Sequence, residues 1–221
     1  MARSSLSSAV NSTLKQMKQH TSTDKGSFGE VAVFKICEEF YQKQGGILYH
    51  SYSYKTANGV EGNLKIKDGE LKLENTGGTT EIDVLLVTPY ALFPIEVKAY
   101  KSKKITLTDR AIDGCLVTDK SPVHQNEMHA RHLYEHIFKC IPNGNPEYIK
   151  PIVTFVDECT VVDNRSNLQK DYIYVSTLNT LSNLLKYMSK PMEFKLDLDA
   201  VDKALREVCT KYEKKLELYK L

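Results

Sequence analysis

Three charged side chains of complementary type lie close together in the middle of this chain. Asp83 belongs to the apolar run 81–87, whereas Glu96 and Lys98 belong to the run 91–98, after a turn that contains proline. Successive strand residues point to opposite faces, so Glu96 and Lys98 would share one face, and Asp83 would join them in the matching register. Carboxylates suit Mg²⁺ and a lysine can orient a metal-bound water, so the pattern predicts metal-assisted phosphodiester hydrolysis.

The alternative is an ordinary cross-strand ion pair on a solvated face of a sheet. Both runs are apolar at nearly every other position, which is typical of strands that are covered on both faces. Charges inside such strands are costly to bury without a partner or an ion. This argument favours a functional site over a surface ion pair.

A helix before these strands carries another candidate carboxylate. Asp24 or Ser27 can cap a helix over about residues 27–43, which Gly45 and Gly46 would end. Glu30 falls in the first turn of this helix, on its apolar stripe, and would point toward the core or a site. The alternative is an N-terminal acid that the helix dipole stabilises.

A later helix, expected over residues 122–140, contributes a neutral candidate. Ser121 can act as its N-cap, and Pro122 suits the first helical position. Gln125 lies in the first turn, where its amide could hold a water or a phosphate oxygen without adding charge. The alternative is a simple surface glutamine.

The order of these features resembles the nuclease-related (NERD) domain of the PD-(D/E)xK nuclease superfamily. The resemblance covers roughly residues 25–180 and rests on four separated motifs, which are GSFGE at 26–30, ID at 82–83, IEVKAY at 95–100 and SPVHQN at 121–126. Two departures are a long polar insert before the Asp83 strand and the lack of any tryptophan, which family members often carry after the ExK strand. The insert bears on the choice of substrate and leaves the expected metal site untouched.

The resemblance implies a role for each matching residue. Asp83 and Glu96 would ligate Mg²⁺, for which Mn²⁺ would substitute, with the Val97 carbonyl as a third ligand. Lys98 would position the attacking water, and Glu30 would ligate a second ion or orient a metal-bound water. The set of catalytic candidates is Glu30, Asp83, Glu96, Lys98 and Gln125.

The later helix also contains a competing pattern. His132, Glu135 and His136 match the H-x-x-E-H arrangement of some zinc proteases, and two histidines four helical positions apart can bind one Zn²⁺. His129 lies one turn earlier, but three histidines stacked along one helix cannot all close on one tetrahedral ion. A ligand from another segment is needed, and the sequence offers no convincing one, so zinc proteolysis is the weaker hypothesis.

A basic cluster follows the proposed catalytic strand, although the formal net charge of the 221 residues is only +2. A basic rim beside an acidic metal site would hold backbone phosphates, which predicts DNA as the partner and strong salt dependence. The alternative is a solvated charge run. The nucleic-acid-binding candidates are Lys101, Lys103, Lys104 and Arg110.

The alternation of helices and strands predicts an α/β fold. The resemblance implies a restriction-endonuclease-like core, with a mixed central β-sheet flanked by helices. Asn58-Gly59 and Asp68-Gly69 are turn signals that mark an inserted β-hairpin over residues 63–74. We expect a polar tail or loose helix at 1–24, the nuclease-related domain at 25–195, and a C-terminal helix at 196–221 that packs on the domain or on a partner.

Two further function classes stay open. The chain could be a catalytically silent nucleic-acid-binding or assembly module, or a nuclease that acts on RNA. A homodimer or a larger nucleic-acid-processing complex is plausible because cleavage of both strands needs two sites. No apolar run is long enough to span a membrane and the polar N-terminus is unlike a signal peptide, so we expect a cytoplasmic protein without membrane contact.

Overall fold

The computed structural model describes residues 22–55, 63–67, 70–74, 79–100, 104–109, 112–113, 121–156 and 159–210. Within these residues, the main sheet has five strands in the order β1-β4-β5-β8-β10. The first three, β1 (Ile47–Lys55), β4 (Thr79–Thr88) and β5 (Ala91–Lys98), are antiparallel neighbours. β8 (Ile152–Phe155) and β10 (Tyr174–Thr177) continue the sheet in parallel. The predicted α/β class with a mixed central sheet is thereby confirmed.

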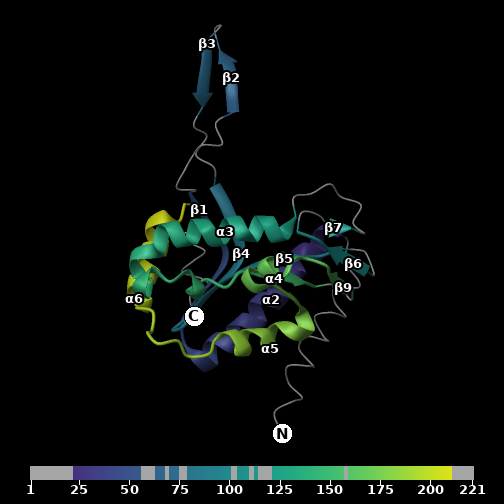
Figure 1. Ribbon diagram of the computed structural model, residues 1–221, viewed down its shortest axis with the longest axis vertical. Helices are drawn as coiled ribbons and strands as arrows, with labels where there is room; N and C mark the ends of the chain where they lie inside the picture. The colour runs from purple at the N-terminus through teal and green to yellow at the C-terminus, as the bar shows by residue number, and fades with distance from the viewer. Residues whose placement is uncertain are drawn as a thin grey trace.

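Helices cover both faces of this sheet (Figure 1). On one face, α2 (Ser22–Gln44) and α5 (Leu178–Met188) pack on the central strands. On the other, α3 (Pro122–Ile137) and α6 (Leu198–Val208) pack on β1, β4 and β5. Three single 3₁₀ turns, Phe138–Cys140, Pro142–Gly144 and Pro146–Tyr148, lead from α3 to β8.

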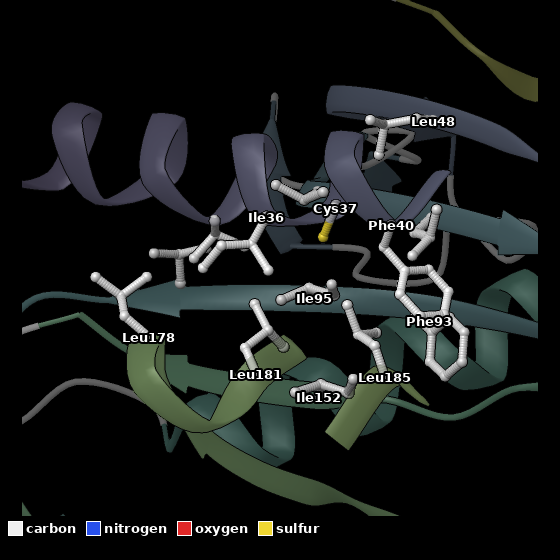
Figure 2. Packing of buried hydrophobic residues seen from close by; sticks show 14 of the residues in the cluster. Ile36, Cys37, Phe40, Leu48, Phe93, Ile95, Ile152, Leu178, Leu181 and Leu185 are labelled. Atoms are coloured by element: carbon white, nitrogen blue, oxygen red, sulfur yellow. The ribbon is translucent and has the colours of Figure 1, made fainter. Parts of the chain in front are cut away.

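The core between the sheet, α2 and α5 is made of aliphatic and aromatic side chains (Figure 2). Ile36 of α2 faces Ile95 of β5 and Phe40 lies against Phe93, with Leu181 and Leu185 of α5 on the side of the strand away from α2. Full burial of each such side chain stabilises the fold by about 1.5–3 kcal/mol. This core fixes α2 over β5, the strand that carries Glu96 and Lys98.

Two smaller sheets accompany the main one. β2 (Asn63–Lys67) and β3 (Glu70–Glu74) form the predicted hairpin. β6 (Lys104–Leu107) pairs with β7 (Ile112–Asp113) and with β9 (Thr160–Asp163). Among the described residues, no helix has the length and apolarity needed to cross a membrane.

The structure differs from the sequence-based expectations in several element bounds. α2 begins at Ser22, so Asp24 and Ser27 lie inside the helix and neither is its N-cap. β10 is preceded by a short helix, α4 (Asn167–Tyr172), that the sequence analysis did not predict. Ser121 occupies the N-cap position of α3 but makes no side-chain capping bond.

The last helix is α6, whereas residues 211–221 lie outside the described part, as do residues 1–21 of the expected tail. α6 packs on β1, where Tyr52 donates to the Leu205 carbonyl at 2.6 Å and Tyr49 donates to Asp202. The predicted domain boundaries stay predictions.

The turn after α2 requires glycine at one of its two positions more than at the other. Gly46 has φ of +138°, and a Cβ there would lie 2.0 Å from the Val87 carbonyl oxygen of β4. Gly45 has φ of +73°, and a Cβ there would meet nothing within 4 Å. We expect Gly46→Ala to lower the free energy of unfolding by about 3 kcal/mol and Gly45→Ala by about 1 kcal/mol. Urea unfolding followed by circular dichroism measures both, and equal losses would contradict the proposed clash.

Candidate active site

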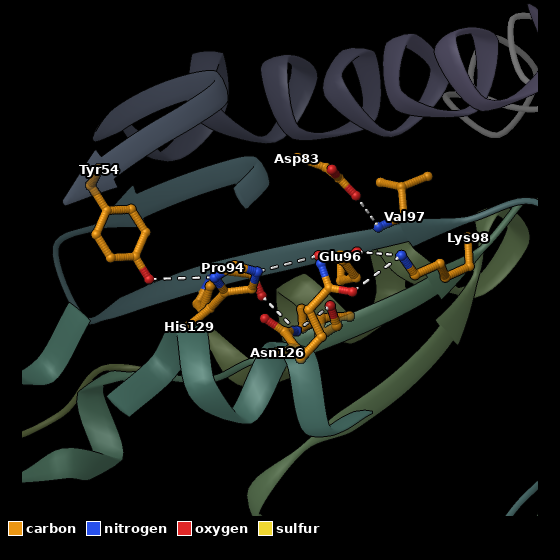
Figure 3. A network of polar contacts seen from close by, with 10 residues as sticks. Tyr54, Asp83, Pro94, Glu96, Val97, Lys98, Asn126 and His129 are labelled. Carbon is orange, nitrogen blue, oxygen red and sulfur yellow. Dashed lines mark hydrogen bonds and ion pairs between the residues drawn. The ribbon is translucent and has the colours of Figure 1, made fainter. Parts of the chain in front are cut away.

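Asp83 lies where β4 and β5 separate. The β4–β5 ladder ends at the pair Val84–Ile95, while β4 continues beside β1. Beyond that point the Val97 backbone N–H donates to the Asp83 carboxylate at 2.7 Å (Figure 3). A side chain thus takes the place of the next backbone acceptor, and it ties Asp83 to the peptide between Glu96 and Lys98.

The pleat of β1 and β4 changes phase at the same place. Ile82 and Leu85 of β4, three residues apart, both pack toward α3 and α6, although strict alternation would put them on opposite faces. Beside them on β1, Ser51 has φ of 51°, a backbone conformation that is uncommon for residues other than glycine. The change of phase places Asp83 at the break between the two alternating patterns.

Glu96 is buried in the middle of the sheet and its two oxygens face different partners. Its exposed fraction is only 2%. The Lys98 ammonium donates to Oε1 at 2.5 Å, and the His129 Nε2 lies 3.6 Å from Oε2 (Figure 3). The Lys98 ammonium also lies 3.4 Å from the Gln125 amide oxygen. Asp83, Glu96, Lys98 and Gln125 are therefore brought to one place.

The start of α3 is fixed to the sheet by a buried asparagine. The Asn126 amide donates to the Pro94 carbonyl of β5 at 3.2 Å and to the Ile152 carbonyl of β8 at 2.8 Å. Asn126 is fully buried, so both bonds form away from water, where an unpaired carbonyl would be costly. This anchor sets the positions of Gln125, one residue earlier, and of His129, one turn later.

α2 covers the face of the main sheet opposite to α3. A Cβ on Gly29 would come within 2.8 Å of the Val156 side chain, so the missing side chain lets the helix approach the end of β8 closely. Glu30 follows directly and is partly buried, with its carboxylate 3.9 Å from the His50 ring of β1. Lys98 and Glu96 both act on its charge, which places Glu30 beside the cluster.

Burial, reinforced by neighbouring carboxylates, shifts the pKa values of two carboxyl groups upward. Burial, followed by the charges of Glu96 and Glu30, raises the pKa of Asp83 from its ordinary 3.8 to about 8, although the Val97 N–H and Lys98 oppose the shift. Burial and the charges of Glu81 and Glu96 also raise the pKa of Glu30. In both side chains, burial and the neighbouring carboxylates disfavour the charged form more than Lys98 favours it.

The donor set suits a hard divalent cation. Burial and neighbouring carboxylates destabilise Asp83 as an anion, and the Oε1 atom of Glu96 beside it faces only the partly exposed Lys98. In the part of the chain that the structure describes, no three side chains of His, Cys, Asp or Glu form a preassembled metal-ligand set. Two carboxylates are enough for Mg²⁺, because this ion keeps several waters and uses few protein ligands.

The remaining site predictions concern the basic cluster and the zinc-protease pattern. Lys104 begins β6 and is exposed, whereas Lys101, Lys103 and Arg110 lie outside the described residues. In the zinc-protease pattern, His132 lies 3.5 Å from its own helical neighbour Glu135, and the rings of His132 and His136 flank the Tyr54 ring at 6.4 and 5.9 Å.

Two residues around Glu96 were missed by the sequence argument. The sequence argument weighs His129 only as a zinc ligand and does not single out Tyr54. Both are buried, and the Tyr54 hydroxyl lies 3.3 Å from the His129 Nδ1. Helical spacing carried a signal for His129, because it lies three and four positions after Asn126 and Gln125 and therefore on their face.

The raised pKa of Asp83 has a consequence for stability in EDTA. Between about pH 4 and pH 8 the folded protein holds a proton that the unfolded chain has released, so this group stabilises the fold fully below pH 4 and progressively less as the pH rises through 8. Asp83→Asn keeps an acceptor for the Val97 N–H and carries no charge. We expect this variant to be more stable than the unmodified protein at pH 8.5 and to show a shallower pH dependence.

Urea unfolding at pH 5, 7 and 8.5 measures both proteins. Identical pH dependence in the two would show that Asp83 is ionised normally in the folded state.

Comparison with known proteins places the chain in a family. Two solved structures resemble it at low identity. The small subunit of the heterodimeric restriction endonuclease R.BspD6I is 11% identical with a TM-score of 0.38, over 96% of this chain and 95% of that one. A protein of unknown function, AF1548, is 13% identical with a TM-score of 0.34, over 85% and 94%. Curated proteins give no match.

The family profile described as the nuclease-related domain matches residues 25–156. This range is more than half of the chain and includes all of the residues gathered around Glu96. The chain belongs to the nuclease-related (NERD) domain family.

Proposed function

We propose that this chain is a Mg²⁺-dependent nuclease that hydrolyses DNA phosphodiester bonds. One observation carries the proposal, namely the 2.7 Å bond that joins the Asp83 carboxylate to the peptide between Glu96 and Lys98. Residues that are 13 positions apart in the sequence thereby form one cluster of two carboxylates and an ammonium. Membership in a nuclease-related family supports the same conclusion.

Asp83 and Glu96 would hold the ion, with the Val97 carbonyl as a third ligand. When bound, Mg²⁺ would polarise the scissile phosphate and supply an acidic water near neutral pH. The carboxylates lie on paired and buried strands, so their positions are rigid, as an in-line attack on phosphorus requires. Mn²⁺, which also prefers oxygen ligands, would substitute.

Other side chains would act on the water and the phosphate. Lys98 would orient the attacking water and stabilise the charge that develops on the phosphate oxygens. The Gln125 amide would hold a water or a phosphate oxygen, and its present contact with Lys98 puts it within reach of the same volume. Glu30 would ligate a second ion or orient a metal-bound water from the α2 side.

DNA is the proposed substrate because phosphate contacts dominate the binding of nucleic acids. Lys104 is exposed at the start of β6, which follows the ExK strand. A formal net charge of +2 predicts modest affinity that falls with added salt. Action on both strands would require a homodimer or a larger complex, because the chain carries one cluster of this kind among its described residues.

A second candidate, a catalytically silent nucleic-acid-binding module, is favoured by one contact. The Lys98 ammonium occupies Oε1 of Glu96 at 2.5 Å, so it neutralises one of the two carboxylates that would otherwise face a cation. A chain that kept this pair closed would bind nucleic acid without cleaving it. An assay of cleavage and binding in the same samples separates the two functions.

We expect the purified chain to cleave supercoiled plasmid in Mg²⁺ or Mn²⁺ but not in EDTA. Lys98→Ala should lower the rate by about 10²- to 10³-fold, because it removes a cation that stabilises the transition state. Asp83→Asn and Glu96→Gln should be as weak as Lys98→Ala, since each removes a charged ligand. Gel analysis of nicked and linear plasmid measures the rates, and labelled single-stranded DNA and RNA test the choice of substrate.

Lys139→Ala is the matched control, because Lys139 is an exposed lysine outside the cluster. It should cleave at the unmodified rate. If Lys98→Ala cleaves as fast as Lys139→Ala, the proposed site is wrong. If the unmodified protein shifts DNA in a gel but does not cleave it in either metal, the silent module is correct.

A further inference from the structure

The strongest unexplained feature near the site is a pair of buried polar atoms without hydrogen-bond partners. His129 Nε2 and Glu96 Oε2 each lack such a bond. They lie 3.6 Å apart, and both side chains are 2% exposed (Figure 3). Buried polar atoms nearly always find a partner, and each of these two is the available complement of the other.

The contact of the other ring nitrogen of His129 indicates which of the two nitrogens carries the proton. The Tyr54 hydroxyl lies 3.3 Å from Nδ1, and this tyrosine is fully buried on β1. Burial raises the pKa of Tyr54, so its hydroxyl keeps its proton and can donate. The hydroxyl can donate or accept, whereas a carboxylate oxygen only accepts, so both contacts are satisfied when the ring proton lies on Nε2 and Nδ1 accepts from Tyr54.

The surroundings hold the ring in this orientation. α3 is pinned one turn earlier by the two bonds of the Asn126 amide to β5 and β8. On the far side, the Tyr54 ring stacks on the Tyr52 ring at 5.5 Å. Both α3, which carries His129, and Tyr54 are therefore held beside Glu96 by contacts of their own.

The two oxygens of Glu96 therefore have different neighbours. Oε1 faces Lys98, which is about a quarter exposed and has a flexible stem, whereas Oε2 faces an imidazole that is almost wholly buried. A cation that arrives at the site would therefore compete with a partly exposed lysine at Oε1 but with a buried ring at Oε2. The asymmetry selects which oxygen of Glu96 the site presents.

We infer that His129, oriented by Tyr54, is a positioning residue that holds Oε2 of Glu96 and so presents Oε1 to a divalent cation. This rests on the proposed function, because it assumes that Glu96 is a ligand. The geometry is that of a donor behind a ligand, and loss of such a partner typically weakens metal affinity by about 10- to 100-fold.

Calorimetric titration with Mn²⁺ tests the inference without any cleavage assay. We expect His129→Leu to weaken Mn²⁺ binding by about 10- to 100-fold. His129→Gln restores an N–H donor toward Glu96 and should recover most of the affinity. Tyr54→Phe should weaken binding less than His129→Leu, because the ring remains but its proton is no longer directed to Nε2.

His132→Leu is the matched control. His132 lies one turn further along α3, and its ring is as far from the Tyr54 ring as that of His129, 6.4 Å in each case. It faces Glu135 and not Glu96, so its loss should leave Mn²⁺ affinity unchanged. Thermal unfolding in EDTA confirms that each variant is folded.

A second measurement on the metal-free protein separates the two possible failures. Long-range ¹H–¹⁵N spectra report which nitrogen of His129 carries the proton, and we expect it on Nε2. If the unmodified protein binds Mn²⁺ and His129→Leu binds it as tightly, the inference is overturned and the proposed function stands. If the unmodified protein binds no Mn²⁺, the proposed metal site fails, and a proton found on Nδ1 with a bare Nε2 would overturn the pairing with Glu96 as well.

Discussion

The burial of the Glu96 carboxylate is the constraint on which the site depends. A carboxylate that is 2% exposed loses nearly all of its hydration, and the fold must replace it with fixed partners. Those partners are Lys98, which shares its strand, and His129, which comes from α3 together with Gln125, the amide that accepts from Lys98. Each element near the site can be understood by how it helps to hold one of these partners.

The separation of β4 from β5 is the second requirement. A continuous ladder would satisfy the Val97 N–H with a backbone carbonyl, and Asp83 would have no reason to turn toward the peptide. The ladder instead ends at the pair Val84–Ile95. Ser51, whose φ is unusual, lies on the neighbouring strand β1 at the level of Asp83. Backbone strain of this kind costs of order 1–3 kcal/mol and tends to cluster at functional sites. Here the strained residue coincides with the phase change that sets the position of Asp83.

Local sequence patterns predicted most of the helices and strands but not the tertiary contacts between them. The strands around residues 81–98, the hairpin and the helix from Pro122 follow from apolar periodicity and turn residues, which act over short distances. α4 and β9 were missed because they are short and carry little periodicity. The start of α2 was placed late because Asp24 and Ser27 are good caps in isolation, whereas the helix continues through them to Ser22.

The site shows the same division. Alternation correctly put Glu96 and Lys98 on one face, since that depends only on the strand itself. It could not locate Asp83, whose position depends on a phase change shared with β1, nor identify His129, whose partner lies 33 residues earlier on another element. A histidine on a helix face matches several functions equally well until the opposing sheet is known. Only the tertiary contacts show that this histidine faces Glu96.

The electrostatic balance of the cluster argues for a site that is completed by a cation. Burial, together with the charges of Glu96 and Glu30, raises the pKa of Asp83 to about 8 although the Val97 N–H and Lys98 oppose the rise, whereas in an ordinary ion pair the pKa would fall. A purely structural cluster would be more stable with one carboxylate fewer, because a neutral side chain could keep the Val97 bond. In the metal-free protein Asp83 therefore ionises only at a cost in stability, and a divalent ion is the partner that would turn this repulsion between carboxylates into attraction.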